Sequence, residues 1–197
     1  MRAQLKPALM LLLIFTVLTG IVYPLAVTGI AQLVFPKQAN GSLIVQNDKV
    51  VGSQLIGQQF DNPKYFWGRL SATGPFPYNA YYGQTLTASS GSNYGPLNPA
   101  LFQEVQARID ALQAADPTNT APIPVDLVTS SGSGLDPDIS VAAAFYQVHR
   151  VAIARGLTDA QVKSLVDQYT EVRQFGFLGE PRINVLELNL ALDHYKP

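Results

Sequence analysis

The sequence contains no cysteine, which excludes disulfides, thiolate metal sites and cysteine nucleophiles. Its two histidines, His149 and His194, lie far apart, and His149 has no histidine or carboxylate four residues away, as a helical metal site would need. A lone helical histidine is more often structural or solvated than a ligand. The chain also lacks a phosphate-binding Gly-x-x-x-x-Gly-Lys-Ser/Thr loop and a Gly-x-Ser-x-Gly nucleophile elbow. We therefore expect no catalytic residues and no metal site.

Charge is absent from residues 7–36, and the first acidic residue is Asp48. About 20 apolar residues suffice to cross the hydrocarbon core of a bilayer, so this run predicts a transmembrane helix. Arg2 and Lys6 precede the run and only Lys37 closely follows it. The excess of positive charge at the start predicts a cytoplasmic N-terminus and an outer location for the chain after residue 36.

A cleaved signal peptide is the alternative reading of this N-terminus. The apolar run continues well past the usual length of a signal peptide core, which favours an uncleaved anchor. Pro24 removes one backbone donor and predicts a kink or a division of the helix near Tyr23. Either this kink is merely tolerated, or Tyr23 and Pro24 shape the span for packing against other membrane helices, with Gly20 and Gly29 as points of close approach.

The remaining chain, residues 37–197, is long enough for one domain. It carries 11 basic and 14 acidic residues, which excludes the basic surface of a nucleic-acid-binding protein. We expect a single extracytoplasmic α+β domain here, after a first segment, residues 1–36, that holds the cytoplasmic N-terminus and the transmembrane helix.

Hydrophobic patterns and turn residues predict the elements of this domain. Asn98-Pro99 is typical of a helix start, Gly156 of a helix end, and Thr158 with Gln161 of a capping box. In chain order we expect a β unit over 41–60 with a turn at 47–48, a helix over 98–115, a strand over 125–128, a helix from 136–138 to 156, a helix from 158, and a strand passing into a short helix over 185–192.

Residues 61–97 are rich in glycine, proline and aromatic residues and show no regular period. Loops of this length in a compact domain are usually functional or disordered, and the aromatic content argues against disorder. We expect an ordered, irregular loop. Its rings, Tyr78 and Tyr82 among them, either form an interface with a partner protein or fill the domain's own core.

A serine- and glycine-rich run, residues 130–134, precedes the expected helix at 136. Such a run can form a backbone nest for an anion, although a plain turn is the more common reading. Asp136 and Asp138 read as caps of that helix rather than as a catalytic pair.

The chain resembles the KdpC family, the small accessory subunit of the bacterial Kdp potassium-transporting P-type ATPase. The resemblance extends over nearly the whole length and is carried by an ordered series of short motifs: Tyr23-Pro24, 38–43, 52–53, 55–58 with Phe60, 65–66, 68–69, 71–72, 78–79, 91–93, 98–99, 124–125, 127–129, Ser131, 133–136, 150–152, 154–155 and 187–193.

This resemblance implies a high-affinity potassium-uptake complex in the bacterial inner (cell) membrane. The implied partners are a channel-like potassium-binding subunit, a P-type ATP-hydrolysing subunit and a small membrane peptide, besides membrane lipid. The family is described as a catalytic chaperone that raises the ATP affinity of the hydrolytic subunit and assists assembly and stability. Its nucleotide-linked region corresponds to Ser131, Ser133, Gly134 and Gln147. ATP and potassium are thus handled by the complex rather than bound by this chain as cofactors.

The charge asymmetry conflicts with direct ATP contact, because P-type ATP sites are cytoplasmic whereas the asymmetry places Ser131 outside. We therefore expect a domain that caps the outer potassium entrance and affects ATP binding indirectly. Two other classes remain open. A membrane-anchored hydrolase would need a nucleophile–base–acid set, and a pilin-like protein would normally carry a glutamate near the start of its apolar helix.

Overall fold

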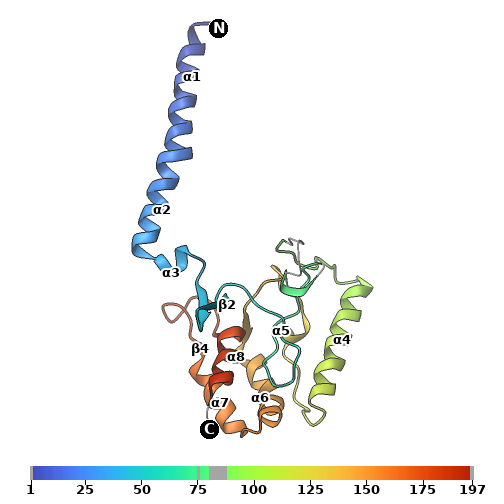
Figure 1. Cartoon of the computed structure of the whole chain (residues 1–197). Helices are drawn as coiled ribbons and strands as arrows, with labels where there is room; N and C mark the ends of the chain where they lie inside the picture. The colour runs from blue at the N-terminus through green and yellow to red at the C-terminus, as the bar shows by residue number, and fades with distance from the viewer. Residues whose placement is uncertain (1, 75, 80–87, 196–197) are drawn as a thin grey trace. The chain divides into compact units, whose positions relative to one another are not determined.

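The computed structural model describes residues 2–74, 76–79 and 88–195. The chain forms two compact units, Met1–Val51 and Gly52–Pro197 (Figure 1). The expected boundary between the two segments, at residues 36–37, lies just after the apolar helix. The two compact units divide later, between Val51 and Gly52.

Unit 1 consists mainly of one long apolar helix. α1 (Arg2–Val17), the π-helical turn η1 (Leu18–Val22) and α2 (Tyr23–Val34) follow one another without a break. The stretch Gln4–Val34 is 31 residues long with a mean hydropathy of 2.4, so it is long and apolar enough to cross a membrane. Near Tyr23, where Pro24 predicted a kink or a division, the helix changes from the π-helical turn η1 to α2 without interruption, with Pro24 as the second residue of α2.

The helix is followed by the short α3 (Pro36–Ala39) and a β-hairpin. Two amides join α2 to the end of α3: Asn40 Nδ2 donates to Gln32 Oε1 at 3.0 Å, and Gln32 Nε2 donates back to Asn40 Oδ1 at 3.3 Å. β1 (Leu43–Gln46) pairs with β2 (Lys49–Ser53). Asn47 and Asp48 have φ values of 49° and 59°, as a type I′ turn requires, which confirms the expected turn.

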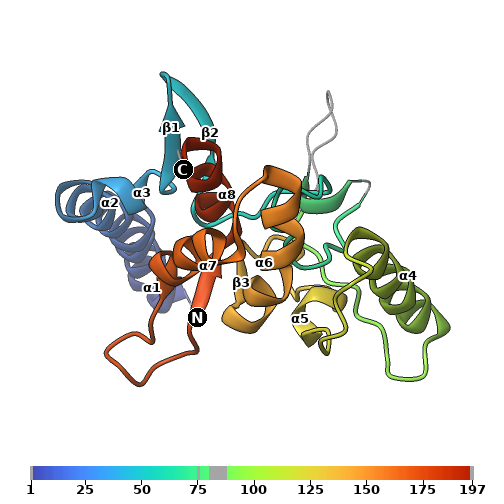
Figure 2. The same ribbon diagram turned by 90° about the horizontal axis from the view of Figure 1, so that it is seen from below.

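Unit 2 combines a small antiparallel sheet with helices, which confirms the expected α+β fold. The strands β3 (Asp138–Ser140), β4 (Thr170–Glu171) and β5 (Arg182–Asn184) lie in the order β3-β5-β4. α6 (Val141–Arg155), α7 (Asp159–Gln168) and α8 (Val185–His194) pack beside them, while α4 (Pro99–Ala115) lies at one edge next to α5 (Val125–Val128) (Figure 2).

The predicted helix ends are confirmed by their caps. Asn98 Oδ1 accepts a hydrogen bond from the N–H of Ala100, with Pro99 as the first residue of α4. Gly156 ends α6 in the left-handed region at φ 67°, where glycine avoids the steric cost of a Cβ. The Thr158–Gln161 capping box opens α7. Residues 185–192, expected to be a strand passing into a helix, are helical throughout as part of α8, and the strand β5 ends just before them at Asn184.

Two predicted elements are wrong. Residues 125–128 form the single helical turn α5 instead of a strand. Leu127 and Val128 are buried in this turn, and a short apolar run looks the same in a buried helical turn as in a buried strand. The helix expected from residues 136–138 begins only at Val141, because Ser140 caps it by accepting from the N–H of Ala143. Residues 138–140 pair with β5 instead.

The clamped segment, residues 62–70, is irregular and leads from the exposed residues 62–64 to the buried residues 66–68 of unit 2. Its residues Phe66 and Trp67 are 0% and 6% exposed. The side-chain amides of two buried residues form hydrogen bonds with the backbone of Phe66 and Trp67, as a neighbouring strand would. Asn189 of α8 accepts from the N–H of Phe66 (2.8 Å) and donates to its carbonyl (2.9 Å). Gln147 of α6 bonds Trp67 in the same way, at 2.8 and 3.1 Å. These amides supply the partners that a buried backbone needs.

Arginine side chains satisfy most of the remaining carbonyls of the clamped segment. Arg150 donates to the carbonyls of residues 63 and 65, Arg155 to that of residue 64, and Arg108 to that of residue 68. Two of these groups lie over the Trp67 ring: the ring centroid is 4.4 Å from the Arg150 guanidinium carbon and 5.0 Å from that of Arg108. Burial lowers the pKa of both guanidinium groups, that of Arg150 to about 10.

Replacing Gln147 tests the clamp. Gln147→Leu keeps the size of the side chain but leaves the N–H and C=O of Trp67 unpaired in the core. We expect a loss of about 2–4 kcal/mol in the free energy of unfolding, measured by denaturant titration of the detergent-solubilised chain. Gln113→Leu on the exposed side of α4 is the matched control and should cost little. Equal stability of the two variants would contradict a structural role for Gln147.

Candidate functional site

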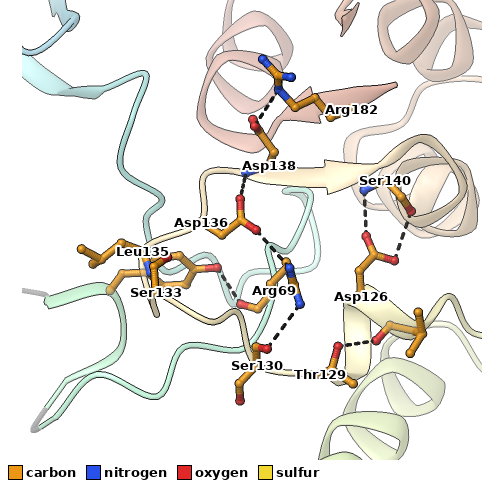
Figure 3. Close-up of polar contacts among 12 residues, drawn as sticks. Arg69, Asp126, Thr129, Ser130, Ser133, Leu135, Asp136, Asp138, Ser140 and Arg182 are labelled. Atoms are coloured by element: carbon orange, nitrogen blue, oxygen red, sulfur yellow. Dashed lines mark hydrogen bonds and ion pairs between the residues drawn. The ribbon is translucent and has the colours of Figure 1, made fainter. Parts of the chain in front are cut away.

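The serine–glycine loop, residues 130–136, leads from α5 to β3 and contains three of the four residues that the family resemblance links to nucleotide (Figure 3). It is attached to the clamped segment at its start. Leu70 and Ser130 form a parallel bridge, and the N–H of Ser131 donates to the carbonyl of Leu70 at 3.0 Å. The loop's position is therefore set by the same segment that organises the core.

Arg69 closes the base of the loop. Its Nη1 donates to Asp136 Oδ2 at 3.1 Å and its Nη2 to the carbonyl of Ser130 at 3.3 Å, so one guanidinium holds both ends (Figure 3). Asp136 Oδ1 in turn accepts from the N–H of Asp138 at 3.0 Å. The sequence context had predicted that Asp136 caps a helix. Asp136 instead holds the turn that leads into β3.

The middle of the loop is fixed by hydroxyl and backbone groups. Ser71 Oγ donates to the carbonyl of Gly134 at 2.6 Å, and the N–H of Ser90 donates to the carbonyl of Ser133 at 2.9 Å. Gly134 has a φ of 69°, and a Cβ at this position would lie 2.5 Å from the carbonyl oxygen of Ser90 and 2.6 Å from Thr73 Cγ2. Only glycine fits there.

Tyr78 lies beneath the loop as a packing residue. Its side chain is 7% exposed, and its hydroxyl donates to the carbonyl of Arg69 at 2.6 Å. Burial, aided by the charge of Asp136, raises the pKa of the Tyr78 phenol to about 12. A Cβ on Gly57 or Gly68 would meet its ring or its hydroxyl. Because the Tyr78 ring is buried, it would influence a partner interface only indirectly, through the shape of the loop around it. Tyr82 lies outside the described residues.

The four residues that the family resemblance links to nucleotide occupy different environments. Ser131 is buried, and its Oγ has no hydrogen-bond partner among the described residues. Ser133 is exposed and its Oγ accepts from the N–H of Leu135, whereas Gly134 is buried. Gln147 lies in the core and is bound to Trp67. The structure thus places residues 131, 133 and 134 in one loop, while the amide of Gln147 is already committed to the clamp.

A groove of about 650 Å³ runs beside the loop, between α5, β3 and the segment before β5. Its lining carries two arginines and four carboxylates: Arg69, Arg182, Asp126, Asp136, Asp138 and Glu180. Both arginines are paired, Arg69 with Asp136 and Arg182 with Asp138 at 2.9 Å. Burial raises the pKa of the Asp138 carboxyl, and Arg182 opposes this. With an excess of carboxylates, the groove disfavours a phosphate group.

Among the described residues, no three histidine or carboxylate side chains lie close enough together to hold a metal ion. His149 instead lies 3.1 Å from Asp159 Oδ2 at the start of α7. This is a pairing between neighbouring helices, of the kind that an exposed histidine commonly makes.

Comparison with known proteins gives a consistent result over the full length. Residues 5–194 match the family described as "KdpC: K+-transporting ATPase, c chain". The chain belongs to the KdpC family. Relatives named "Potassium-transporting ATPase KdpC subunit" include those of Herpetosiphon aurantiacus, 67% identical over 100% of this chain and 98% of the relative, and of Methylococcus capsulatus, 63% identical over 95% and 96%. The chain is therefore a component of a membrane-associated potassium-transport ATPase.

Several important residues of this KdpC-family chain escaped the sequence analysis. Arg108, Arg150, Arg155 and Asn189 hold the clamped segment, yet no catalytic or ligand-binding pattern marks them. One signal was available. Gln147 and Arg150 lie one helical turn apart on the apolar stripe of α6, and a buried polar pair on such a stripe indicates a buried hydrogen-bond network.

Two glycines of the serine–glycine loop make a matched test of its shape. Gly134→Ala forces a Cβ against backbone at a positive φ, whereas Gly132→Ala meets no atom within 4 Å. We expect Gly134→Ala to lower the free energy of unfolding by about 1–3 kcal/mol and Gly132→Ala to change it little. Thermal unfolding of both variants provides the measurement. A Gly132→Ala effect as large as that of Gly134→Ala would argue against the packing described.

Proposed function

We propose that this chain is the non-catalytic accessory subunit that stabilises a high-affinity potassium-uptake ATPase from the outer side of the bacterial inner membrane. Its partners are the channel-like potassium-binding subunit, the P-type ATP-hydrolysing subunit and the small membrane peptide. The observation that carries the proposal is that the arginine and amide side chains in the interior of unit 2 form hydrogen bonds with the backbone of the clamped segment. Side chains occupied in this way suit a rigid binding module.

The proposed topology rests on charge. Arg2 and Lys6 lie at the N-terminal end of the apolar helix, and no acidic residue precedes Asp48. By the positive-inside rule the N-terminus lies in the cytoplasm and unit 2 lies outside, with the helix kept as an uncleaved anchor. Unit 2 would then cap the potassium entrance of the channel-like subunit.

Any effect on ATP binding is indirect in this proposal. An outer domain cannot reach a cytoplasmic nucleotide, and the groove beside the serine–glycine loop has more carboxylates than arginines. The catalytic-chaperone role would be exerted through the assembled complex. Residues 131–134 would contribute by keeping the shape of the serine–glycine loop and would not hold ATP themselves.

An apolar hairpin tip, residues 172–178, is the docking surface that we assign to a partner subunit. Val172, Phe175 and Phe177 are 79%, 79% and 70% exposed. Reciprocal backbone hydrogen bonds between Gln174 and Leu178, at 3.0 and 2.9 Å, hold the turn that presents them. Soluble proteins rarely expose apolar side chains in such a cluster, and a protein interface commonly needs one.

The charges at the base of the tip favour protein over lipid as the occupant. Arg173 pairs with Glu180, and Arg182 pairs with Glu171 at 2.7 Å. Both arginines are thereby neutralised, whereas a surface that binds anionic lipid headgroups needs unpaired cations. A partner subunit with an apolar patch of its own fits the tip better.

The topology can be tested with single cysteines, because the chain has none of its own. Ser133→Cys and Gln113→Cys lie on exposed positions of unit 2, and Gln4→Cys lies at the predicted cytoplasmic end. In intact spheroplasts we expect a membrane-impermeant maleimide to label the two outer cysteines. Gln4→Cys should react only after the membrane is opened. The reverse pattern would contradict the topology.

The docking role of the hairpin tip can be tested by co-purification of tagged chain with its partner subunits. Replacing both Phe175 and Phe177 by serine removes most of the apolar tip without touching the core. We expect at least about a tenfold loss of retained partners, as for central interface residues. Phe102→Ser on α4, where Phe102 is 63% exposed, is the matched control and should keep them. Full retention by the double variant would contradict the assignment.

A further inference from the structure

The carbonyl of Thr19, in the π-helical turn η1, lacks the donor that an α-helix or a π-helix would give it. In an α-helix it would accept from the N–H of residue 23. The N–H of Tyr23 donates to the carbonyl of Leu18 instead. In a π-helix the donor would be residue 24, but Pro24 has no N–H. Within the described span, both helical donors of the Thr19 carbonyl are therefore lost.

The position of this carbonyl makes the loss costly. Residue 19 lies midway along the apolar stretch Gln4–Val34, and thus at the centre of the hydrocarbon core of a bilayer. An unpaired backbone group costs several kcal/mol in hydrocarbon, where no water is available. Lipid chains have no donor to offer. The Thr19 hydroxyl donates to the carbonyl of Phe15 at 2.6 Å, so it does not serve its own backbone.

The surroundings of the carbonyl leave it open to another helix. Gly20 follows directly, and a Cβ built on it would meet no atom within 4 Å. None of the span's apolar window is buried within this chain. Small residues allow the backbones of membrane helices to approach each other closely, and polar side chains then bond across the contact.

We propose that the Thr19 carbonyl accepts a hydrogen bond from a hydroxyl or amide side chain on a membrane-spanning helix of a partner subunit. The π-turn is then a recognition site: it releases one acceptor at the membrane centre, and a partner helix with a donor at that depth fills it. This inference rests on the proposed function as an accessory subunit of a membrane complex. It adds the position and the chemistry of one contact.

The first experiment restores the missing donor. Pro24→Ala supplies an N–H to the helix and gives the Thr19 carbonyl an internal partner, which removes the need for an external one. We expect partner subunits to be retained about 3- to 10-fold less well on co-purification in detergent. Pro7→Ala, at a proline near the beginning of the same helix, is the matched control and should retain them as the native chain does.

The second experiment observes the carbonyl itself. Labelling with carbonyl-¹³C threonine and ¹⁵N glycine selects the three Thr–Gly pairs of the chain, at residues 19–20, 28–29 and 73–74. Pro24→Ala identifies the first pair, because its signal should move most in that variant. On assembly of the native chain with its partners, we expect the carbonyl shift of Thr19 to move to that of a hydrogen-bonded group and the Thr28 carbonyl to stay in place.

The outcomes separate this inference from the proposed function. A Thr19 carbonyl that is hydrogen-bonded already in the isolated chain and unchanged on assembly would show that water fills the site, and would overturn the inference. Full retention of partners by Pro24→Ala would overturn it as well. In both cases the native chain still co-purifies with its partners, whereas failure of the native chain to do so would overturn the proposed function itself.

Discussion

Unit 2 depends on hydrogen bonds that side chains make to one irregular, partly buried segment. Residues 62–70 have no regular partner strand, yet every carbonyl from residue 63 to residue 70 accepts a hydrogen bond from Arg150, Arg155, Asn189, Gln147, Arg108, Tyr78 or the N–H of Ser131. The donors come from α4, α6, α8, the 3₁₀ turn Pro77–Asn79 and the serine–glycine loop. One segment thereby connects elements that a sheet of three short strands could not hold together.

The serine–glycine loop belongs to the same network. Arg69 and Leu70, the last residues of the clamped segment, hold the loop at Asp136, Ser130 and Ser131. The shape of the loop and the stability of the core are therefore coupled. A substitution in the loop that changes the behaviour of a complex does not by itself identify a ligand contact, because it also disturbs the packing of the clamped segment.

Sequence patterns predicted those parts of the structure that local chemistry decides. The Asn98 cap, the Gly156 end and the Thr158–Gln161 capping box each depend on residues within one turn, and all three are confirmed. The strand expected at 125–128 failed because a run of three apolar residues and one aspartate is too short for its period to separate strand from helix. The helix start expected at 136–138 failed because pairing with β5, far along the chain, outweighed the local capping pattern.

The candidate site was predictable only as a stretch of chain. Serines and glycines marked residues 130–134, but the partners that shape the loop come from residues 69–73 and 89–90. The spacing of residues along the sequence does not reveal that these distant segments lie next to the loop. The clamp was invisible for a related reason: its arginines and amides bond to backbone carbonyls, and any residue supplies a carbonyl, so no motif arises.

The side-chain donors of the clamp keep their hydrogen bonds over a wide range of pH. The amides of Gln147 and Asn189 do not titrate, and the lowered pKa of Arg150, about 10, still leaves that side chain charged at any pH a bacterium commonly meets. Histidines and carboxylates, whose charge changes between about pH 4 and 7, donate none of these bonds. A domain that faces the surrounding medium, as proposed, would thus keep the bonds of its clamped segment when that medium becomes acidic, while the cell inside holds its own pH.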